Sequence, residues 1–183
     1  MRIRSTLVIA LIVLVSAIAH AQYSYPTRRA LVADVCPDLK ITSFSFDDVY
    51  ERSSNRFKTS YAWRNQGEKD IIAFEFVVVR FDPFNDSLIG FRSVMPGHNS
   101  ATYKPLKKGE EDADGSSSFS SSKTYTAFAY IRSIRYSDNT VWRAATEDVI
   151  AAIKKQAPDI LDPGSVDPPK PGSAGGGSRS RAR

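Results

Sequence analysis

The chain has 183 residues, a formal net charge of +5 and 42% hydrophobic residues. This length suits one domain with terminal extensions, and the hydrophobic content is sufficient for a packed core. The excess positive charge lies mostly at the two ends of the chain, which excludes an extended basic face for nucleic acid on the nearly neutral central part.

Residues 1–21 have the pattern of a secretory signal peptide. Arginines precede an apolar run from Leu7 to Ala19, and small residues at Ala19 and Ala21 form a cleavage motif. The run is shorter than the ~20 residues of a transmembrane helix, and Gln22 stands where a lipoprotein would need a cysteine. The sequence therefore predicts cleavage after Ala21 and a soluble mature protein without a membrane span, either periplasmic or secreted.

Residues 22–38 are expected to form an extended N-terminal lead-in. This segment contains Cys36, the only cysteine of the chain, which therefore has no intramolecular disulfide partner. Free cysteine is among the most frequently buried residue types, so a small buried thiol is the first interpretation. Because exported proteins meet an oxidising environment, a Cys36-linked dimer is the alternative.

Residues 39–157 are predicted to form the folded domain, and its clearest pattern is a period of two. Phe57, Thr59, Tyr61 and Trp63 alternate with smaller or charged neighbours. This alternation is typical of a strand that buries one aromatic face and exposes the other face to solvent.

The next segments predict a hairpin followed by a less regular region. The run Ile71–Phe81 is almost continuously β-branched or aromatic, which indicates a central strand covered on both faces. Residues 82–86 form a predicted turn before a strand from Leu88 to Val94. Ala101–Leu106 is a candidate edge strand, and Lys107–Ser122 is expected to be a long polar loop.

A second long strand is predicted over Lys123–Tyr136, followed by a tight turn and a short strand at Val141–Arg143. Together these patterns give about seven short strands joined by Gly, Pro, Asn and Asp turns. The predicted fold class is all-β, an antiparallel immunoglobulin-like β-sandwich with one C-terminal helix.

The helix that closes the domain is expected to begin at Thr146 as its N-cap. Glu147 and Asp148 lie favourably at the positive end of the helix dipole. Val149, Ile150 and Ile153 form an apolar stripe that should dock on the sandwich, and Pro158 ends the helix.

Residues 158–183 are predicted to form a disordered tail rich in Pro, Gly, Ser and Arg. A cationic tail ending in Arg179, Arg181 and Arg183 would be attracted to anionic envelope polymers. A solvated terminus without a specific role is the simpler interpretation.

Four segments show apolar strand patterns followed by turns: residues 61–65, 71–76, 79–82 and 134–142. The last of them contains the turn Asp138-Asn139-Thr140 and then Trp142. These segments resemble a broad group of small bacterial exported domains with an immunoglobulin-like or fibronectin-III-like sandwich. That group commonly has glycine in the turn where Asn139 stands, and asparagine also tolerates positive φ. The resemblance implies a sandwich over about residues 39–143 and a binding or accessory role, and it identifies no active site.

The mature chain offers little for catalysis or for cofactor or metal binding. His98 is its only histidine once the signal peptide is removed, and nothing in the spacing brings it to Cys36. Glu110, Asp112 and Asp114 imitate the start of a calcium loop, but Ser121 stands where a bidentate glutamate is expected. We therefore predict no enzyme activity, no cofactor and no catalytic or metal-binding residues; weak calcium binding by the acidic loop is the alternative.

These patterns favour an exported, non-enzymatic binding or accessory domain that acts on an envelope partner, a protein or a glycan. The alternative is a carbohydrate-binding module, in which strand aromatics would form an exposed platform for stacking on sugars. Core packing is nevertheless the commoner role of such residues. The aromatic candidates are Tyr61, Trp63, Tyr130, Tyr136 and Trp142.

Overall fold

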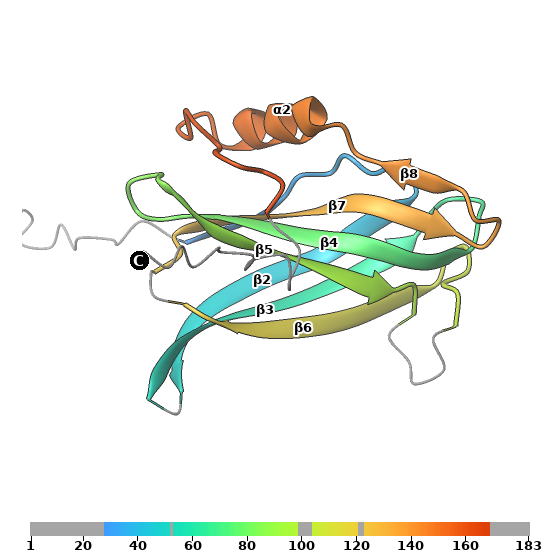
Figure 1. Ribbon diagram of the computed structural model, residues 1–183, viewed down its shortest axis with the longest axis horizontal. Helices are drawn as coiled ribbons and strands as arrows, with labels where there is room; N and C mark the ends of the chain where they lie inside the picture. The colour runs from blue at the N-terminus through green and yellow to red at the C-terminus, as the bar shows by residue number, and fades with distance from the viewer. Residues whose placement is uncertain (1–27, 52, 99–103, 121–122, 169–183) are drawn as a thin grey trace, which may run out of the picture.

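The computed structural model describes residues 28–168 except 52, 99–103 and 121–122. Two β-sheets pack face to face, and a helix covers the outer face of one of them (Figure 1). The large sheet has the strand order β1-β7-β4-β5, with β8 also paired to β7, and the small sheet has the order β2-β3-β6. The predicted all-β sandwich with a C-terminal helix is confirmed.

The strand and helix bounds are as follows: β1 Arg29–Val32, β2 Leu39–Glu51, β3 Ser54–Asn65, β4 Ile71–Phe81, β5 Ser87–Pro96, β6 Glu111–Phe119, β7 Thr126–Tyr136, β8 Val141–Arg143 and α2 Thr146–Gln156. The pairing of the described strands is antiparallel except between β1 and β7, which run parallel.

The inner core lies between the two sheets and contains the aromatic face predicted for β3. Trp63 and Phe57 are almost completely buried, and so is Tyr61. The Tyr61 ring stacks on Phe76 of β4 with 4.0 Å between ring centroids, and Trp63 meets Phe74 edge to face at 5.1 Å. The period-two prediction for β3 is therefore confirmed.

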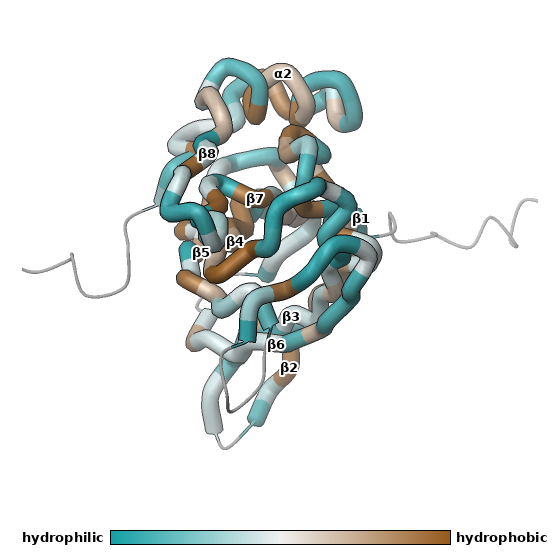
Figure 2. The backbone as a smooth tube through the Cα atoms, turned by 90° about the vertical axis from the view of Figure 1, so that its right-hand side faces the viewer, coloured by the Kyte–Doolittle hydropathy of each residue, from teal (hydrophilic) through white to brown (hydrophobic). Residues whose placement is uncertain are grey.

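The outer core lies on the opposite face of the large sheet. Val77 and Val79 of β4 and Tyr130 of β7 pack there against Val149 and Ile153 of α2. Hydrophobic residues accordingly concentrate in β4 and β7, the middle layer between the helix and the small sheet (Figure 2). This arrangement explains the continuous apolar run in β4. A strand that is covered on both faces has no solvent-facing positions, so polar residues do not alternate with apolar ones along it.

The helix begins one residue earlier than predicted, at Thr146. The N-cap position is Ala145, whose side chain offers no hydrogen-bond acceptor, and Thr146 is already helical. The prediction of Thr146 as N-cap is therefore wrong, although Glu147 and Asp148 do lie in the first turn. Because the helix has no side-chain cap, its stability comes mainly from the packing of Val149 and Ile153 on the large sheet.

Two of the strands fall in segments for which no strand was predicted, the extended lead-in and the polar loop. The lead-in contains β1, whose residues pair with β7 from Arg29↔Thr126 to Val32↔Ala129. The expected polar loop contains β6, which pairs with β3 from Arg56↔Phe119 to Arg64↔Glu111. The candidate edge strand before it lies partly outside the described residues, and its last residue, Leu106, forms an isolated bridge with Ile71.

The C-terminal segment 158–168 packs on the outer face of the large sheet. Ile160 and Val166 are buried in the outer core, and the Tyr130 hydroxyl donates a hydrogen bond to the Val166 carbonyl oxygen. Asp167 forms ion pairs with Arg92 at 2.8 Å and Arg132 at 3.4 Å. The prediction of a tail that is disordered from residue 158 is wrong for these residues; residues 169–183 lie outside the described part.

The turn chemistry follows the sequence closely. The Asp82 carboxylate accepts hydrogen bonds from the backbone N–H groups of Phe84 and Asp86, as expected for an Asx turn. Asn139 adopts a φ of 65°, as predicted for the position where glycine is common. Within the described residues, no helix combines the length and apolar character needed to cross a bilayer.

Candidate functional site

His98 and Cys36, the formal nucleophile–base pair, do not interact in the described structure. His98 Nδ1 instead lies 2.8 Å from a carboxylate oxygen of Asp112 on β6. Cys36 is buried in the inner core, and its sulfur accepts a hydrogen bond from the backbone N–H of Leu39. Burial raises the pKa of the Cys36 thiol to about 11, which favours its unreactive neutral form.

The acidic residues that suggested a calcium loop lie at the start of a strand and do not converge. Asp112 and Asp114 belong to β6, and each carboxylate accepts a hydrogen bond from the next backbone N–H. Glu110 precedes the strand and accepts from the backbone N–H of Lys107. Among the described residues, no group of three or more His, Cys, Asp or Glu side chains is arranged to hold a metal ion.

The aromatic residues considered for sugar stacking are mostly part of the two cores. Tyr61, Trp63, Tyr130 and Tyr136 are all no more than 5% exposed, and Trp142 is half-buried. These side chains do not form an exposed platform. The large apolar side chains that do reach solvent include Ile89, which is 85% exposed, and Phe119, which is 73% exposed.

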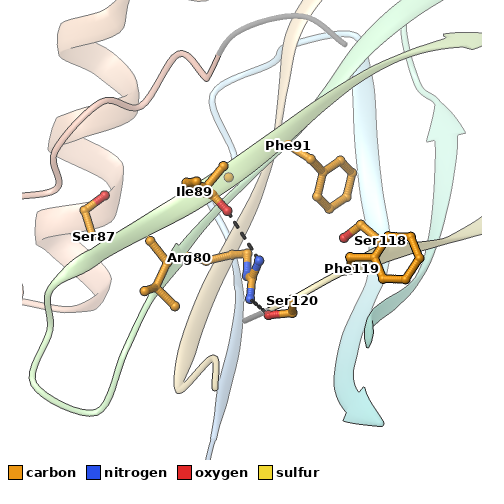
Figure 3. A pocket seen from close by; sticks show the side chains of 9 residues that line it. Arg80, Ser87, Ile89, Phe91, Ser118, Phe119 and Ser120 are labelled. Atoms are coloured by element: carbon orange, nitrogen blue, oxygen red, sulfur yellow. Dashed lines mark hydrogen bonds between the residues drawn. The ribbon is translucent and has the colours of Figure 1, made fainter. Parts of the chain in front are cut away.

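Ile89 and Phe119 flank a pocket between β5 and β6, the edge strands of the two sheets (Figure 3). The pocket has a volume of about 350 Å³. We call it the edge pocket. Its lining comprises Arg80, Ser87, Leu88, Ile89, Gly90, Phe91, Ser118, Phe119 and Ser120.

Arg80 contributes a buried cation to the edge pocket. Its guanidinium donates to Thr124 Oγ1 at 2.8 Å, Ser120 Oγ at 2.7 Å and the Ile89 carbonyl oxygen at 3.3 Å. It also lies 4.1 Å from the centre of the Phe57 ring. Burial lowers the pKa of Arg80, and the nearby Asp48 carboxylate acts in the opposite direction. Arginine nonetheless stays charged in proteins, so the pocket carries a fixed positive charge.

The backbone of β5 is irregular beside Arg80. Val78 pairs with Phe91 and Arg80 pairs with Leu88, so Ile89 and Gly90 together oppose one residue of β4. This β-bulge turns the Ile89 carbonyl toward Arg80 and leaves its side chain in solvent. Because bulges disfavour pairing with a further strand, recognition at this edge has to rely on side chains.

The edge pocket combines groups suited to binding. One cation lies beside hydroxyl groups of Ser118 and Ser120 and apolar surface from Ile89, Phe91 and Phe119. No residue of the lining, as far as the structure describes it, carries a carboxylate. The net charge of the lining is therefore positive.

Sequence reasoning missed this site for two reasons. Phe119 lay in a segment predicted to be a loop, and the bulge that exposes Ile89 has no clear sequence signature. Arg80 offered one sequence signal for the site. It lies an even number of residues from Phe76 and Val78, so its side chain is on the same face of β4 as these inner-core residues. A charged residue at an inward position of a doubly covered strand needs a special environment.

No protein-family model and no curated protein matches the chain significantly. One solved structure with some similarity is a hypothetical protein from Peptoclostridium difficile 630, with a TM-score of 0.43 and 10% sequence identity. The alignment covers 66% of this chain and 92% of that chain. A similarity of this size supports no conclusion about function.

Proposed function

We propose that this protein is an exported, non-enzymatic binding domain that captures a segment of an envelope protein in the edge pocket. The export part of the proposal rests on the signal-peptide pattern of residues 1–21. The binding part rests on one observation: two highly exposed apolar side chains, Ile89 and Phe119, flank a pocket that contains a buried cation.

The exposure of Ile89 and Phe119 favours a protein partner. Soluble proteins keep contiguous apolar surface small, and apolar residues around a concave site commonly mark a place of interaction. On the Phe119 side, the guanidinium of Arg56 lies 4.5 Å from the ring centre, so this aromatic group is already held on the rim of the pocket. An apolar side chain of the partner would pack between Ile89 on one side of the pocket and Phe119 on the other.

The charge of the edge pocket favours an acidic group on the same partner segment. Among the described residues that line the pocket, Arg80 alone is charged, and a carboxylate near it would gain a charge-assisted interaction in a partly desolvated site. The preferred ligand is therefore an extended peptide that presents one large apolar residue close to an aspartate or glutamate.

A randomised peptide library displayed on phage tests this proposal against the purified protein. We expect enrichment of peptides that combine a large apolar residue with a nearby acidic residue. Binding of the enriched peptides should fall at least about tenfold in the variant Ile89→Ser, because a buried apolar contact contributes roughly 1.5–3 kcal/mol.

Leu161→Ser provides a matched control, because Leu161 is as exposed as Ile89, at 85%, but does not line the edge pocket. This variant should bind the enriched peptides like the unmodified protein, and both variants should keep the original melting temperature. Failure to enrich any sequence class, or equal binding by Ile89→Ser and Leu161→Ser, would contradict the proposal.

A further inference from the structure

The outer face of the large sheet is divided into a covered half and an open half. Helix α2 and the C-terminal segment cover the part formed by Val77, Val79 and Tyr130. The other part lies toward β8, where a pocket of about 290 Å³ remains open. We call it the arginine pocket.

Strand register places the side chains of the arginine pocket in two rows across the large sheet. Glu75 on β4 is paired with Val94 on one side and with Ser133 on the other, and Ser133 is paired with Arg143. The adjacent row runs from Ala73 through Arg135 to Val141. Residues paired across neighbouring strands share a face, so all of these side chains lie on the outer face of the sheet.

Hydrogen bonds and ion pairs hold the floor of the arginine pocket in place. Glu75 accepts from Arg92 at 2.7 Å and from the Ser133 hydroxyl at 2.5 Å. Arg92 also pairs with Asp167 of the C-terminal segment. These groups are occupied by one another, and they fix the shape of the pocket.

Arg135 and Arg143 differ from the other arginines, because the side chain of neither makes a hydrogen bond, ion pair or ring contact within the part of the chain that the structure describes. Each of the other described arginines has at least one such contact: Arg28, Arg29, Arg56, Arg64, Arg80, Arg92 and Arg132. The arginine pocket therefore has two guanidinium groups whose donors are available to a ligand.

The two available arginines lie on a diagonal across β7 and β8, two register positions apart. Side chains in this relation start about 7–8 Å apart, a distance that two arginine side chains span easily. Both carry positive charge, so they repel each other unless an anion lies between them. Counting the whole lining, three arginines face one glutamate, which leaves a net charge of +2.

We propose that the arginine pocket binds a phosphate monoester group through Arg135 and Arg143. A carboxylate has two oxygens, and a single guanidinium fork can satisfy both of them. A phosphate monoester has three terminal oxygens and a charge near −2 at neutral pH, which matches two guanidinium groups and the net charge of the pocket. Val94 and Val141 would contact the organic part of the ligand.

This site is separate from the edge pocket, and its existence does not depend on the proposed capture of a peptide. The two sites share no lining residue. Either proposal can fail while the other holds.

Isothermal titration of the purified protein with glycerol phosphate at low ionic strength tests the assignment. We expect saturable binding that weakens at least about tenfold in Arg135→Gln and in Arg143→Gln, because each variant removes a charge-assisted contact. Lys154→Gln is the matched control: it removes one positive charge from an exposed position on α2, outside the arginine pocket. It should leave the affinity unchanged, and all three variants should melt like the unmodified protein.

Two further ligands identify the source and the chemistry of the anion. Binding to vesicles of phosphatidic acid but not to glycerol phosphate, if lost in both arginine variants, would support the site and assign it to a lipid headgroup. Tighter binding of malonate than of glycerol phosphate would overturn the assignment to phosphate. The absence of binding to both phosphate ligands, or binding that survives both arginine substitutions, would overturn the proposal as a whole.

Discussion

Among single residues, Trp63 makes the most informative core contact. Its ring is 1% exposed, packs against Phe74 and Tyr61, and donates a hydrogen bond from Nε1 to the Gly97 carbonyl oxygen at 3.0 Å. We expect Trp63→Ala to lower the free energy of unfolding by about 3–5 kcal/mol, because it removes a large buried ring and leaves a cavity. Urea denaturation followed by circular dichroism measures this change.

Trp63→Phe is a milder change at the same position. Phenylalanine retains an aromatic ring but leaves the Gly97 carbonyl without its indole donor, which should produce a smaller loss of about 1–3 kcal/mol. A midpoint that does not move in Trp63→Ala would show that the ring is not part of the core.

At the scale of secondary-structure elements, the C-terminal segment offers the sharpest prediction. Truncation after Asp162 removes Val166 from the outer core, the hydrogen bond from Tyr130 and the ion pairs of Asp167. We expect the melting temperature to fall, with a loss of about 2–4 kcal/mol, most of it from apolar burial. Truncation after Pro168 is the control, since it keeps all of these contacts; equal melting temperatures for the two truncations would contradict the docking.

The elements differ in how far the sequence could predict them, and the reason is the kind of contact that stabilises each. β3 and β4 carry the apolar side chains that bury them, so their hydrophobic patterns are visible in the sequence. The alternation in β3 and the continuous apolar run in β4 therefore predicted both strands correctly. β6 consists mainly of Asp, Ser, Gly and Ala with few strand-forming residues, and it is held by backbone pairing to β3 and by polar side-chain contacts such as Thr59–Ser116 and Arg64–Glu111. No local pattern indicates such a strand.

β1 and the docked C-terminal segment escaped prediction for a related reason. Each is short and contributes few apolar side chains, such as Ile160 and Val166, to a core that distant parts of the chain create. The edge pocket has the same origin, because β5 and β6 meet there only after both sheets have formed. The sequence shows a charged residue at position 80, but it does not show that Thr124, Ser120 and the Ile89 carbonyl would surround it.

At the scale of the whole molecule, the large sheet joins the inner and outer cores into one structure. β4 alternates its side chains between them, so Phe76 faces the small sheet while Val77 faces α2. A disturbance in one core should therefore propagate to the other through the strand they share. This coupling predicts a single cooperative unfolding transition.

The variant Ile153→Ala tests this coupling from the outer core. Ile153 is fully buried under α2, and its truncation should cost about 2–5 kcal/mol. With Trp142, which packs against both cores, replaced by phenylalanine in all samples, the fluorescence of Trp63 reports on the inner core on the other side of the large sheet. We expect the fluorescence and circular dichroism midpoints to move together by the same amount in urea. If the circular dichroism midpoint moved while Trp63 fluorescence kept its original midpoint, the two cores would unfold independently and the shared sheet would not couple them.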